Sequence, residues 1–512
     1  MMSLLQAAKI LDARLIGDDG YFESVSTDSR KIKAGDLFIA LRGENFDGYE
    51  FVSTAAQTGA VASVVNADSY TARPAPADSR SPILLVKDTR LALGRLAAYW
   101  RNQFDIPLVG ITGSNGKTTV KEMLASILRV AAGSDGAVLA TKGNLNNDIG
   151  MPLTLLQLST QHRFAVIEMG MNHPGEIDYL TRIASPDVAL INNASGAHLE
   201  GLGSVEAVAQ AKGEIFAGLQ YEGTAVINAD DEHAPLWRSL VGVNQLLEFG
   251  LDGMTRCAKA SGAGIPSHRL LPQSAGYAIT SDLASVVGSP CRLASSSTSN
   301  VSEAGTQADI HGQWQPHDAG LRLNAQTPRG NFTADMQVPG AHNARNALAA
   351  TAAAIALNVP LDAIAAGLEK FGGVAGRLQR KTAMHGAILI DDTYNANPAS
   401  LRAAISVLAE AKGKRVLVLG DMGELGEDAA TFHAGIGIEA RDAGIEKLYA
   451  LGALSRNAVR EFGSGAQHFE GIEELLSALA KELDANTTVL VKGSRFMKME
   501  RVVQHCCAAT GK

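Results

Sequence analysis

The sequence of 512 residues has few cysteines and no excess of basic residues. Its four cysteines, Cys257, Cys291, Cys506 and Cys507, show neither zinc-site spacing nor a disulfide pattern, which favours a reducing compartment, the cytoplasm. The formal net charge of -8 offers no basic surface for phosphate backbones. We therefore expect a cytoplasmic protein that has no nucleic-acid partner.

Long apolar runs are also lacking. The most apolar helical stretch, residues 347–357, is rich in alanine and too short to span a bilayer. The opening segment, MMSLLQAAKILDARL, has charges scattered among apolar residues at helical spacing, so it predicts a helix of the fold instead of a signal peptide. We expect no membrane insertion.

The length predicts about three domains, because a single core rarely extends over so many residues. We predict an α/β protein with domains at residues 1–104, 105–338 and 339–512. In the middle domain, short apolar runs alternate with helical patterns, which predicts a doubly wound parallel sheet. Residues 261–320 break this alternation, and their Ser-rich composition predicts a low-complexity, partly disordered insertion. The third domain shows the same α/β alternation.

The stretch IPLVGITGSNGKTT, residues 106–119, predicts a nucleotide-triphosphate site. A buried strand, a glycine-rich loop and a helix start would place backbone N–H groups and a helix dipole around an anion. Lys117 would reach the outer phosphates, and Thr118 would bind magnesium. Ile111 stands where the strict phosphate-loop pattern requires its first glycine, so the sequence carries a variant, T-G-x-N-G-K-T-T.

Five other polar residues stand at predicted strand ends or in loops and helices, and alone they have ordinary structural interpretations. The residues are Glu168, His198, Lys212, Arg377 and Asp392. A carboxylate at a strand end can cap it, a lone histidine is often a core hydrogen-bonder, and a helical lysine is commonly solvated. Ligands of open α/β sheets bind at the carboxyl ends of the strands, which makes the group candidates for a site. Spacing alone leaves both interpretations open.

Taken in order, these motifs resemble those of the Mur ligases, which build the peptide of the peptidoglycan precursor. The segments are GITGSNGKTT, VIEMG, HLEGLG, AKGEIF, PGAHNARNALAA, GRL and DDTYNANP. The resemblance covers nearly the whole chain except the insertion. KGNLNNDIG, GDMGELG and VKGSR resemble the member that adds a dipeptide. The D-N-P-R motif of the diaminopimelate-adding member and the D-Y-G-H-H-P motif of the L-alanine-adding member are absent.

The resemblance implies an ATP-dependent, ADP-forming ligase that uses Mg²⁺. Its partners would be UDP-N-acetylmuramoyl-tripeptide and D-alanyl-D-alanine, and we expect it to act as a monomer. The N-terminal domain would bind the UDP-sugar, the middle domain ATP, and the third domain would complete the ligase. An alternative is a ligase resembling folylpolyglutamate synthase, although that family has its phosphate loop near the chain start. A second alternative is a nucleotide-dependent switch or scaffold, which would hydrolyse ATP to move domains and would need no amine acceptor.

The resemblance also implies roles for individual residues. Six are expected to be catalytic: Lys117, Glu168, His198, Lys212, Arg377 and Asp392. Those expected to bind ATP are Thr112, Gly113, Ser114, Asn115, Gly116, Lys117, Thr118, Thr119, Asn343, Asn346, Arg377 and Asn395. Those expected to bind the UDP-sugar peptide are Ser29, Asn45, Asn146 and Asn172. Those expected at the metals are Thr118, Glu168, His198 and Lys212, the last as an N-carboxylate.

Overall fold

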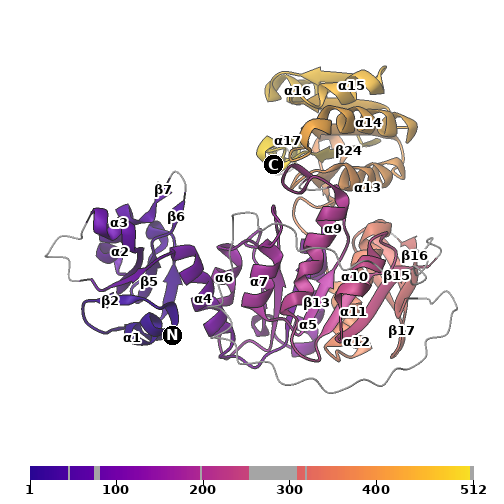
Figure 1. Cartoon of the computed structure of the whole chain (residues 1–512). Helices are drawn as coiled ribbons and strands as arrows, with labels where there is room; N and C mark the ends of the chain where they lie inside the picture. Colours follow the sequence, from indigo (N-terminus) through magenta and orange to yellow (C-terminus); the bar gives the residue numbers. More distant parts are fainter. Residues whose placement is uncertain (44–45, 74–80, 197–198, 253–307, 318–319, 508–512) are drawn as a thin grey trace.

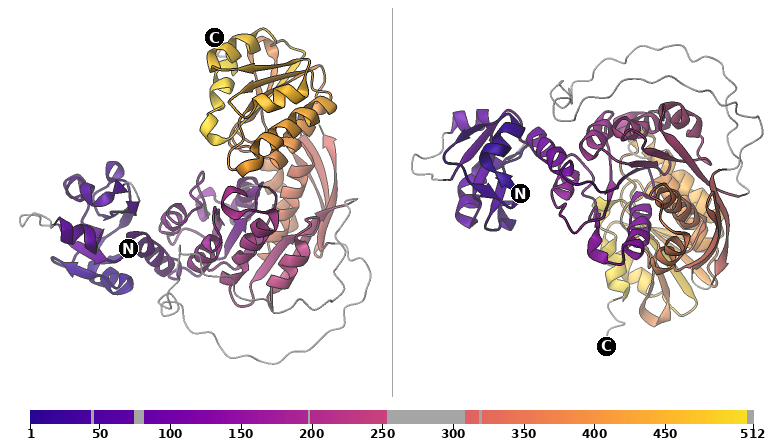
Figure 2. Two further views of the ribbon diagram at one scale, coloured as in Figure 1. Left: turned by 45° about the horizontal axis from the view of Figure 1, so that its top comes forward. Right: turned by 90° about the horizontal axis from the view of Figure 1, so that it is seen from below.

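A computed structural model describes residues 1–43, 46–73, 81–196, 199–252, 308–317 and 320–507. The described residues form three main sheets, one in each of three units that follow one another along the chain (Figure 1). The N-terminal unit lies beside the central unit, and the C-terminal unit lies over the other end of the central unit (Figures 1 and 2). The α/β class predicted from the sequence is therefore confirmed.

The N-terminal unit is a small sheet whose strands are parallel apart from β2. Its order is β2 (Arg14–Ile16), β9 (Ile83–Val86), β8 (Ala62–Asn66), β5 (Asp36–Ile39) and β4 (Ser24–Ser26). Two small ribbons pair β1 (Met2–Ser3) with β3 (Tyr21–Phe22) and β6 (Arg42–Gly43) with β7 (Phe46–Asp47). The helices are α1 (Leu4–Leu11), α2 (Val52–Thr58), α3 (Ala67–Ala72) and α4 (Thr89–Arg101). Helix α4 packs against central helices, so one apolar core continues through both units.

The central sheet is parallel over seven strands, β11 to β16 in the order below, and ends in an antiparallel extension. Its order is β11 (Val138–Ala140), β12 (Phe164–Glu168), β10 (Leu108–Thr112), β13 (Val188–Ile191), β14 (Thr224–Asn228), β15 (Gln245–Leu251), β16 (Ile310–His317), β17 (Gly320–Thr327) and β18 (Gly330–Met336). The predicted parallel, doubly wound sheet is therefore present. The antiparallel pairs β16–β17 and β17–β18 are an addition that the sequence interpretation missed.

Helices cover both faces of the central sheet, as is usual for parallel sheets. Alternate residues of each strand point to opposite faces, so each strand contributes to two apolar clusters. Val109 and Ile111 pack with α5 (Lys117–Ala132), α11 (Ala341–Ala356) and α12 (Leu361–Lys370). Leu108 and its neighbours pack on the opposite face. The helices that follow along the chain are α6 (Gly150–Leu155), α7 (Glu176–Ala184), α8 (Leu199–Leu202), α9 (Val205–Gly213) and α10 (Ala234–Leu240).

The C-terminal unit contains a six-stranded sheet in which the edge strand β19 is antiparallel and the other strands are parallel. Its order is β19 (Gln379–Thr382), β20 (Ile388–Asp392), β24 (Thr487–Lys492), β21 (Lys414–Gly420), β22 (Lys447–Leu451) and β23 (Ala466–Phe469). The helices are α13 (Pro398–Ala409), α14 (Ala429–Asp442), α15 (Arg456–Phe462), α16 (Ile472–Ala480) and α17 (Glu500–Cys507). Two separate apolar clusters cover its two faces.

Helices α11 and α12 pack with the central unit, although the sequence-based boundary at residue 339 assigns them to the third domain. Both contact α5, and the carbonyl of Gly367 accepts a 2.7 Å hydrogen bond from Ser126 Oγ. A Cβ at Gly367 would lie 2.4 Å from Ile127 Cα, so α12 approaches α5 too closely for a larger residue. We therefore propose that the C-terminal unit begins after α12, near β19.

The low-complexity interpretation of residues 261–320 needs one correction. Residues 253–307 and 318–319 lie outside the described part of the chain. Residues Ile310–His317, however, form β16, which pairs with β15 and β17. The sequence IHGQWQPH is mostly polar and does not predict a strand. The strand forms through backbone pairing with its neighbours and through the burial of a few residues at its start. Ile310 is fully buried in the central core.

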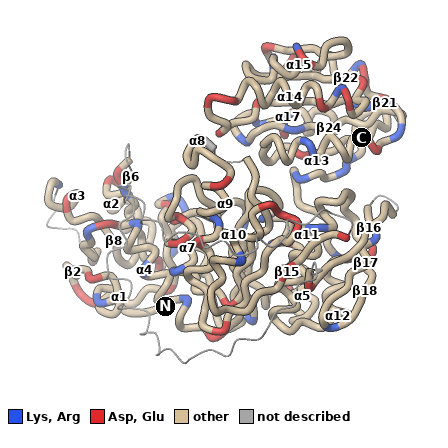
Figure 3. The backbone as a smooth tube through the Cα atoms, turned by 45° about the vertical axis from the view of Figure 1, so that its right-hand side comes forward, with Lys and Arg blue, Asp and Glu red and all other residues tan. Residues whose placement is uncertain are grey.

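Within the described residues, no helix is long and apolar enough to cross a membrane. Lys and Arg are interspersed with Asp and Glu over all three units (Figure 3).

Ile310→Ala should destabilise the protein by about 2–5 kcal/mol, because it leaves a cavity beneath the sheet. Thermal unfolding should show a lowered melting temperature. Gln313→Ala, at an exposed position of the same strand, is the matched control and should change it little. Equal stability of the two variants would contradict the placement of β16 in the central sheet.

Candidate active site

The predicted phosphate loop connects the end of β10 to the start of α5. Gly113 has φ 152° and Gly116 has φ 79°, conformations that other residues rarely adopt. A Cβ at Gly116 would lie 2.5 Å from both Asn192 Nδ2 and Asn346 Oδ1. The two glycines therefore bring the loop backbone close to the polar side chains that surround it, at a helix N-terminus that favours anions.

Two asparagines at the end of β13 hold the loop in this shape. Asn193 Oδ1 accepts a hydrogen bond from the N–H of Asn115 at 2.8 Å, and Asn192 Nδ2 donates to the carbonyl of Asn115 at 2.9 Å. Ser195 N donates to Ser114 Oγ at 2.9 Å. Sequence reasoning missed Asn192, Asn193 and Ser195, although the NNAS letters directly after a predicted buried strand are a signal for such a role.

Lys117 is the first residue of α5 and lies over its own loop. Its Nζ donates to the carbonyl of Gly113 at 2.5 Å and to that of Ser114 at 3.4 Å. Burial lowers the pKa of Lys117, and the carboxylate of Glu168 opposes this shift. Arg377 adds to the lowering because it is a second cation nearby. An anion bound in the loop would favour the charged form of this lysine.

Glu168 ends β12, next to β10, where the parallel register pairs it with Ile111. Its carboxylate is only 2% exposed. Oε2 accepts from Thr118 Oγ1 at 2.9 Å, and Oε1 accepts from Asn146 Nδ2 at 2.8 Å. A buried carboxylate and hydroxyl beside a phosphate loop suit Mg²⁺, which commonly takes few protein ligands and completes its shell with phosphates and water.

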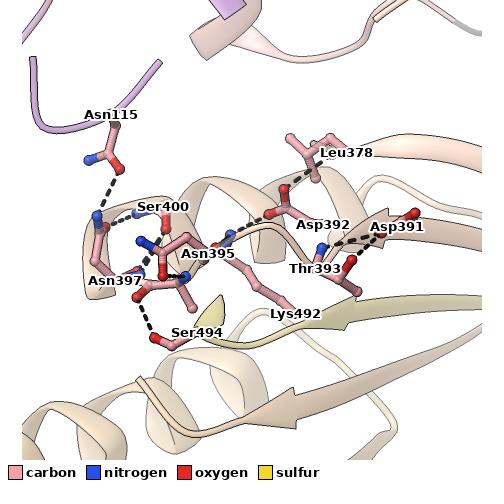
Figure 4. A network of polar contacts seen from close by, with 11 residues as sticks. Asn115, Leu378, Asp391, Asp392, Thr393, Asn395, Asn397, Ser400, Lys492 and Ser494 are labelled. Atoms are coloured by element: carbon pink, nitrogen blue, oxygen red, sulfur yellow. Dashed lines mark hydrogen bonds and ion pairs between the residues drawn. The ribbon is translucent and has the colours of Figure 1, made fainter. Parts of the chain in front are cut away.

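The C-terminal unit contacts the phosphate loop through two side chains. Arg377 Nη2 donates to Thr118 Oγ1 at 2.9 Å, and the Arg377 guanidinium carbon lies 4.2 Å from the centroid of the Tyr394 ring. Asn397 Nδ2 donates to Asn115 Oδ1 at 2.8 Å (Figure 4). Asn397 Oδ1 meanwhile caps α13 by accepting from the N–H of Ser400, so both ends of one amide are engaged. Sequence reasoning did not find Asn397 or Tyr394.

Asp392 is a buried carboxylate that organises the C-terminal side of the site (Figure 4). Oδ2 pairs with Lys492 Nζ at 2.5 Å, and Oδ1 accepts from the N–H of Leu378 at 3.2 Å. Burial raises the pKa of Asp392, and Lys492 opposes the rise. Because Leu378 follows Arg377 directly, this bond fixes the segment that carries the arginine.

The N-terminal end of α11 supplies the two other predicted asparagines. Asn346 Oδ1 accepts from Asn192 Nδ2 at 2.9 Å, and Asn343 Nδ2 donates to the carbonyl of Pro339 at 2.8 Å. Both side chains are buried. Asn395, in contrast, is exposed on the C-terminal unit, where its Oδ1 accepts from the N–H of Ala396.

A cavity of about 1440 Å³ connects these groups. The predicted residues that line it are Ser114, Asn115, Gly116, Lys117, Thr119, Asn146, Glu168, Asn172, Asn343, Asn346, Arg377, Asp392 and Asn395. Thr112, Gly113 and Thr118 lie behind its wall, and Thr118 reaches the site through its bonds to Glu168 and Arg377. Ser29 lies apart, half-buried in the N-terminal unit. His198 and Asn45 are outside the described residues.

Lys212 lies on α9 and is 1% exposed. Its Nζ has no hydrogen-bond or ion-pair partner among the residues that the structure describes. Burial, and then the charge of Lys117, lower the pKa of Lys212 well below its ordinary value. A buried lysine whose pKa is lowered in this way suits the expected N-carboxylate, which stays a prediction.

Three family models match successive parts of the chain. They are described as Mur ligase family, catalytic domain, at residues 21–101; Mur ligase middle domain, at 111–265; and Mur ligase, glutamate ligase domain, at 376–495. A relative from Escherichia coli (strain K12), named UDP-N-acetylmuramoyl-tripeptide–D-alanyl-D-alanine ligase, is 39% identical over 506 residues, and the match covers 98% of each chain.

Solved structures give a matching result. A crystal structure of MurF from Acinetobacter baumannii is 32% identical, with a TM-score of 0.80 over 98% of this chain and 97% of that one. MurF ligase from Thermotoga maritima, solved in complex with ADP, is 25% identical, with a TM-score of 0.73 over 94% of this chain and 96% of that one. A folylpolyglutamate synthase from Mycobacterium tuberculosis, at 16% identity and a TM-score of 0.56 over 83% of this chain and 95% of that one, shares the fold alone.

Lys117→Ala should lower the rate of ATP-dependent phosphate release about 10²-fold or more, the usual loss when one charge-stabilising donor is removed. Phosphate release and the melting temperature should be measured together. Lys370→Ala, at an exposed position at the end of α12, is the control and should behave as the unmodified protein. Near-normal turnover of Lys117→Ala would mean that this lysine does not contact the phosphates.

Lys212→Ala should lose most activity and regain part of it with added formate or acetate. We expect this because a neutral amine can add CO₂, forming a C–N bond and releasing a proton, and the small carboxylates would replace the oxygens of that carbamate. Lys212→Arg should stay inactive despite its charge. A carbamate carbon signal after incubation with isotopically labelled bicarbonate should appear in the unmodified protein and be missing in Lys212→Ala.

An active Lys212→Arg variant, or the lack of that signal in the unmodified protein, would show that the lysine is not carboxylated.

Proposed function

The chain belongs to the Mur ligase family, and from this membership we propose that it joins D-alanyl-D-alanine to UDP-N-acetylmuramoyl-tripeptide with hydrolysis of ATP to ADP and phosphate. The observation that carries the proposal is the phosphate loop with Lys117 and Thr118, which Arg377 of the C-terminal unit closes. The relatives that extend over nearly the whole chain carry this activity in their names. We place the reaction in the cytoplasm, where ATP and UDP-sugars are available.

In the first step the terminal carboxylate of the tripeptide attacks the γ-phosphorus of ATP. A P–O bond forms to give an acyl phosphate, and the bond to ADP breaks. Two unit charges 4 Å apart repel by about 4 kcal/mol at an effective dielectric of 20, and the γ-phosphate carries more than one charge. Lys117 and Arg377 lie where they can offset this repulsion.

Magnesium fits this arrangement, because Glu168 and Thr118 supply hard oxygen ligands beside the loop. When bound there, Mg²⁺ supplies positive charge to the phosphate oxygens. We assign the protein ligands of one metal ion to Thr118 and Glu168. For a second ion we propose His198 and carboxylated Lys212.

In the second step the neutral amine of the dipeptide attacks the acyl carbon. A C–N bond forms, the amine loses a proton, and inorganic phosphate leaves with its electron pair. Water competes for the same carbon, so the site must be closed before the acyl phosphate forms. The bonds Arg377–Thr118 and Asn397–Asn115 support closure by the C-terminal unit, because both would break if that unit moved away.

The remaining predicted residues are assigned to substrate binding by position. Asn146 and Asn172 line the cavity on the side of the central unit from which α4 leads to the N-terminal unit. We propose that they contact the peptide of the UDP-muramoyl substrate, and that Ser29 and Asn45 of the N-terminal unit contact its UDP end. Asn343, Asn346 and Asn395 are proposed to bind ATP.

Phosphate release should require ATP, Mg²⁺, UDP-muramoyl tripeptide and D-alanyl-D-alanine together. Each component is omitted in turn, and the peptide product is identified by mass spectrometry. Removal of Mg²⁺ with a chelator should abolish turnover, and its return should restore it. D-alanine alone is the control acceptor and should give little product.

Equal turnover with the single amino acid would contradict the proposed acceptor. Turnover without any acceptor would instead favour a nucleotide-dependent switch.

A further inference from the structure

Two sequence motifs, GDMGELG and VKGSR, meet in the C-terminal unit and have no part in the mechanism above. They follow β21 and β24, which are neighbouring parallel strands, so both loops leave the same edge of the sheet. A Cβ at Gly493 would lie 3.0 Å from Gly420 Cα and 2.7 Å from Met499 Cγ. The two glycines therefore let the loop backbones touch. Both loops line the cavity.

Ser494 fixes the second loop. Its N–H donates to the carbonyl of Asp421 at 3.0 Å, and its Oγ accepts from the N–H of Gly423 at 2.8 Å and donates to the carbonyl of Ala396 at 3.2 Å. The side chain is buried, and Figure 4 shows its bond toward the segment that carries Asn395 and Asn397. The backbone of the next residue, Arg495, is thereby held in place, while its side chain is largely exposed.

Arg495 is a weakly paired cation at the wall of the cavity. Its side chain is 66% exposed, and its ion pair with Glu500 is long, at 3.6 Å. Lys498, which also lines the cavity, has no ion-pair partner among the described residues. Three further cations of the wall also have carboxylate partners: the pairs are Arg90–Asp148, Arg345–Asp230 and Lys492–Asp392. Arg495 and Lys498, which both line the cavity, can therefore attract an anionic group.

Arg495 lies near the residues that surround the phosphate loop. The guanidinium carbon of Arg377 lies 4.2 Å, and that of Arg495 6.0 Å, from the centroid of the same Tyr394 ring, so the two carbons are at most about 10 Å apart. Arg377 contacts Thr118 and so marks the reacting end of the cavity. A dipeptide extends about 7 Å, which is within this limit. A carboxylate bound by Arg495 would place a dipeptide amine near the reacting centre.

We propose that Arg495, together with Lys498, binds the terminal carboxylate of the dipeptide acceptor. The inference rests on the proposed function and specifies its acceptor subsite. Guanidinium and carboxylate form paired, charge-assisted hydrogen bonds, which are both strong and directional. Phe496, 62% exposed, lies over Gly423 and offers an apolar surface to the methyl groups of the alanines.

The test compares D-alanyl-D-alanine with its C-terminal amide in the full-length protein and in Arg495→Gln. The unmodified protein should use the free acid better than the amide by roughly 10- to 100-fold in kcat/KM, the usual effect of losing a charge-assisted pair. Arg495→Gln should lower kcat/KM for the free acid by a similar factor and leave that for the amide nearly unchanged. The KM values for ATP and for the UDP-muramoyl tripeptide should not change.

Arg456→Gln is the matched control, since Arg456 is 60% exposed on the same unit and pairs with Glu470 away from the cavity. It should keep the preference for the free acid. Lys498→Gln should reduce that preference to a smaller extent.

Two results would overturn the inference, and they differ from each other. If Arg495→Gln retains the full preference for the free acid while the unmodified protein is active, the acceptor subsite is assigned wrongly and the proposed function stands. If the unmodified protein makes no product from the dipeptide under any condition, the proposed function fails and the subsite fails with it.

Discussion

The site depends on one buried hydroxyl, that of Thr118, which connects elements far apart in the sequence. It donates to Glu168 at the end of β12 and accepts from Arg377 of the C-terminal unit. A hydroxyl can donate and accept at once, so a single side chain joins the phosphate loop, the carboxylate suited to a metal and the arginine that closes the cavity. Loss of either partner, Glu168 or Arg377, would leave this buried hydroxyl with one hydrogen bond fewer, which is costly.

Several cationic side chains lie around this hydroxyl, and their mutual repulsion contributes to the lowered pKa values of Lys117 and Lys212. Lys117 and Lys212 are close enough that the charge of Lys117 contributes to lowering the pKa of Lys212, and Arg377 does the same to Lys117. Burial is the largest cause for both lysines. Cations gathered in a desolvated site repel one another until an anion arrives. A bound polyphosphate, or a carbamate formed on Lys212, would relieve that repulsion.

The C-terminal unit closes over the loop through polar contacts, in contrast to the apolar core that continues from the N-terminal unit into the central unit. Arg377 and Asn397 reach the loop by single hydrogen bonds, while the apolar clusters of the C-terminal unit stay within that unit. Single hydrogen bonds contribute about 0.5–1.5 kcal/mol each, so such contacts can break and form during a catalytic cycle. An apolar interface would hold the units together more permanently. This difference fits a ligase that must open for three substrates and close before the acyl phosphate forms.

The sequence by itself determined the phosphate loop, the parallel sheets and the motifs that indicate the family, because these depend on residues close together in the chain. Gly113, Gly116 and Lys117 act within one short loop, and the apolar runs around residues 108–112 and 164–168 specify buried strands. Tertiary structure alone decided the pairing of β16 with β15, the packing of α11 and α12 on α5, and the contacts of Asn397 with Asn115 and of Arg377 with Thr118. These contacts join residues separated by tens to hundreds of positions, and local propensity does not specify which surfaces meet. They follow from the geometry of layers packed against one another, which brings the carboxyl ends of two sheets to face a common cavity.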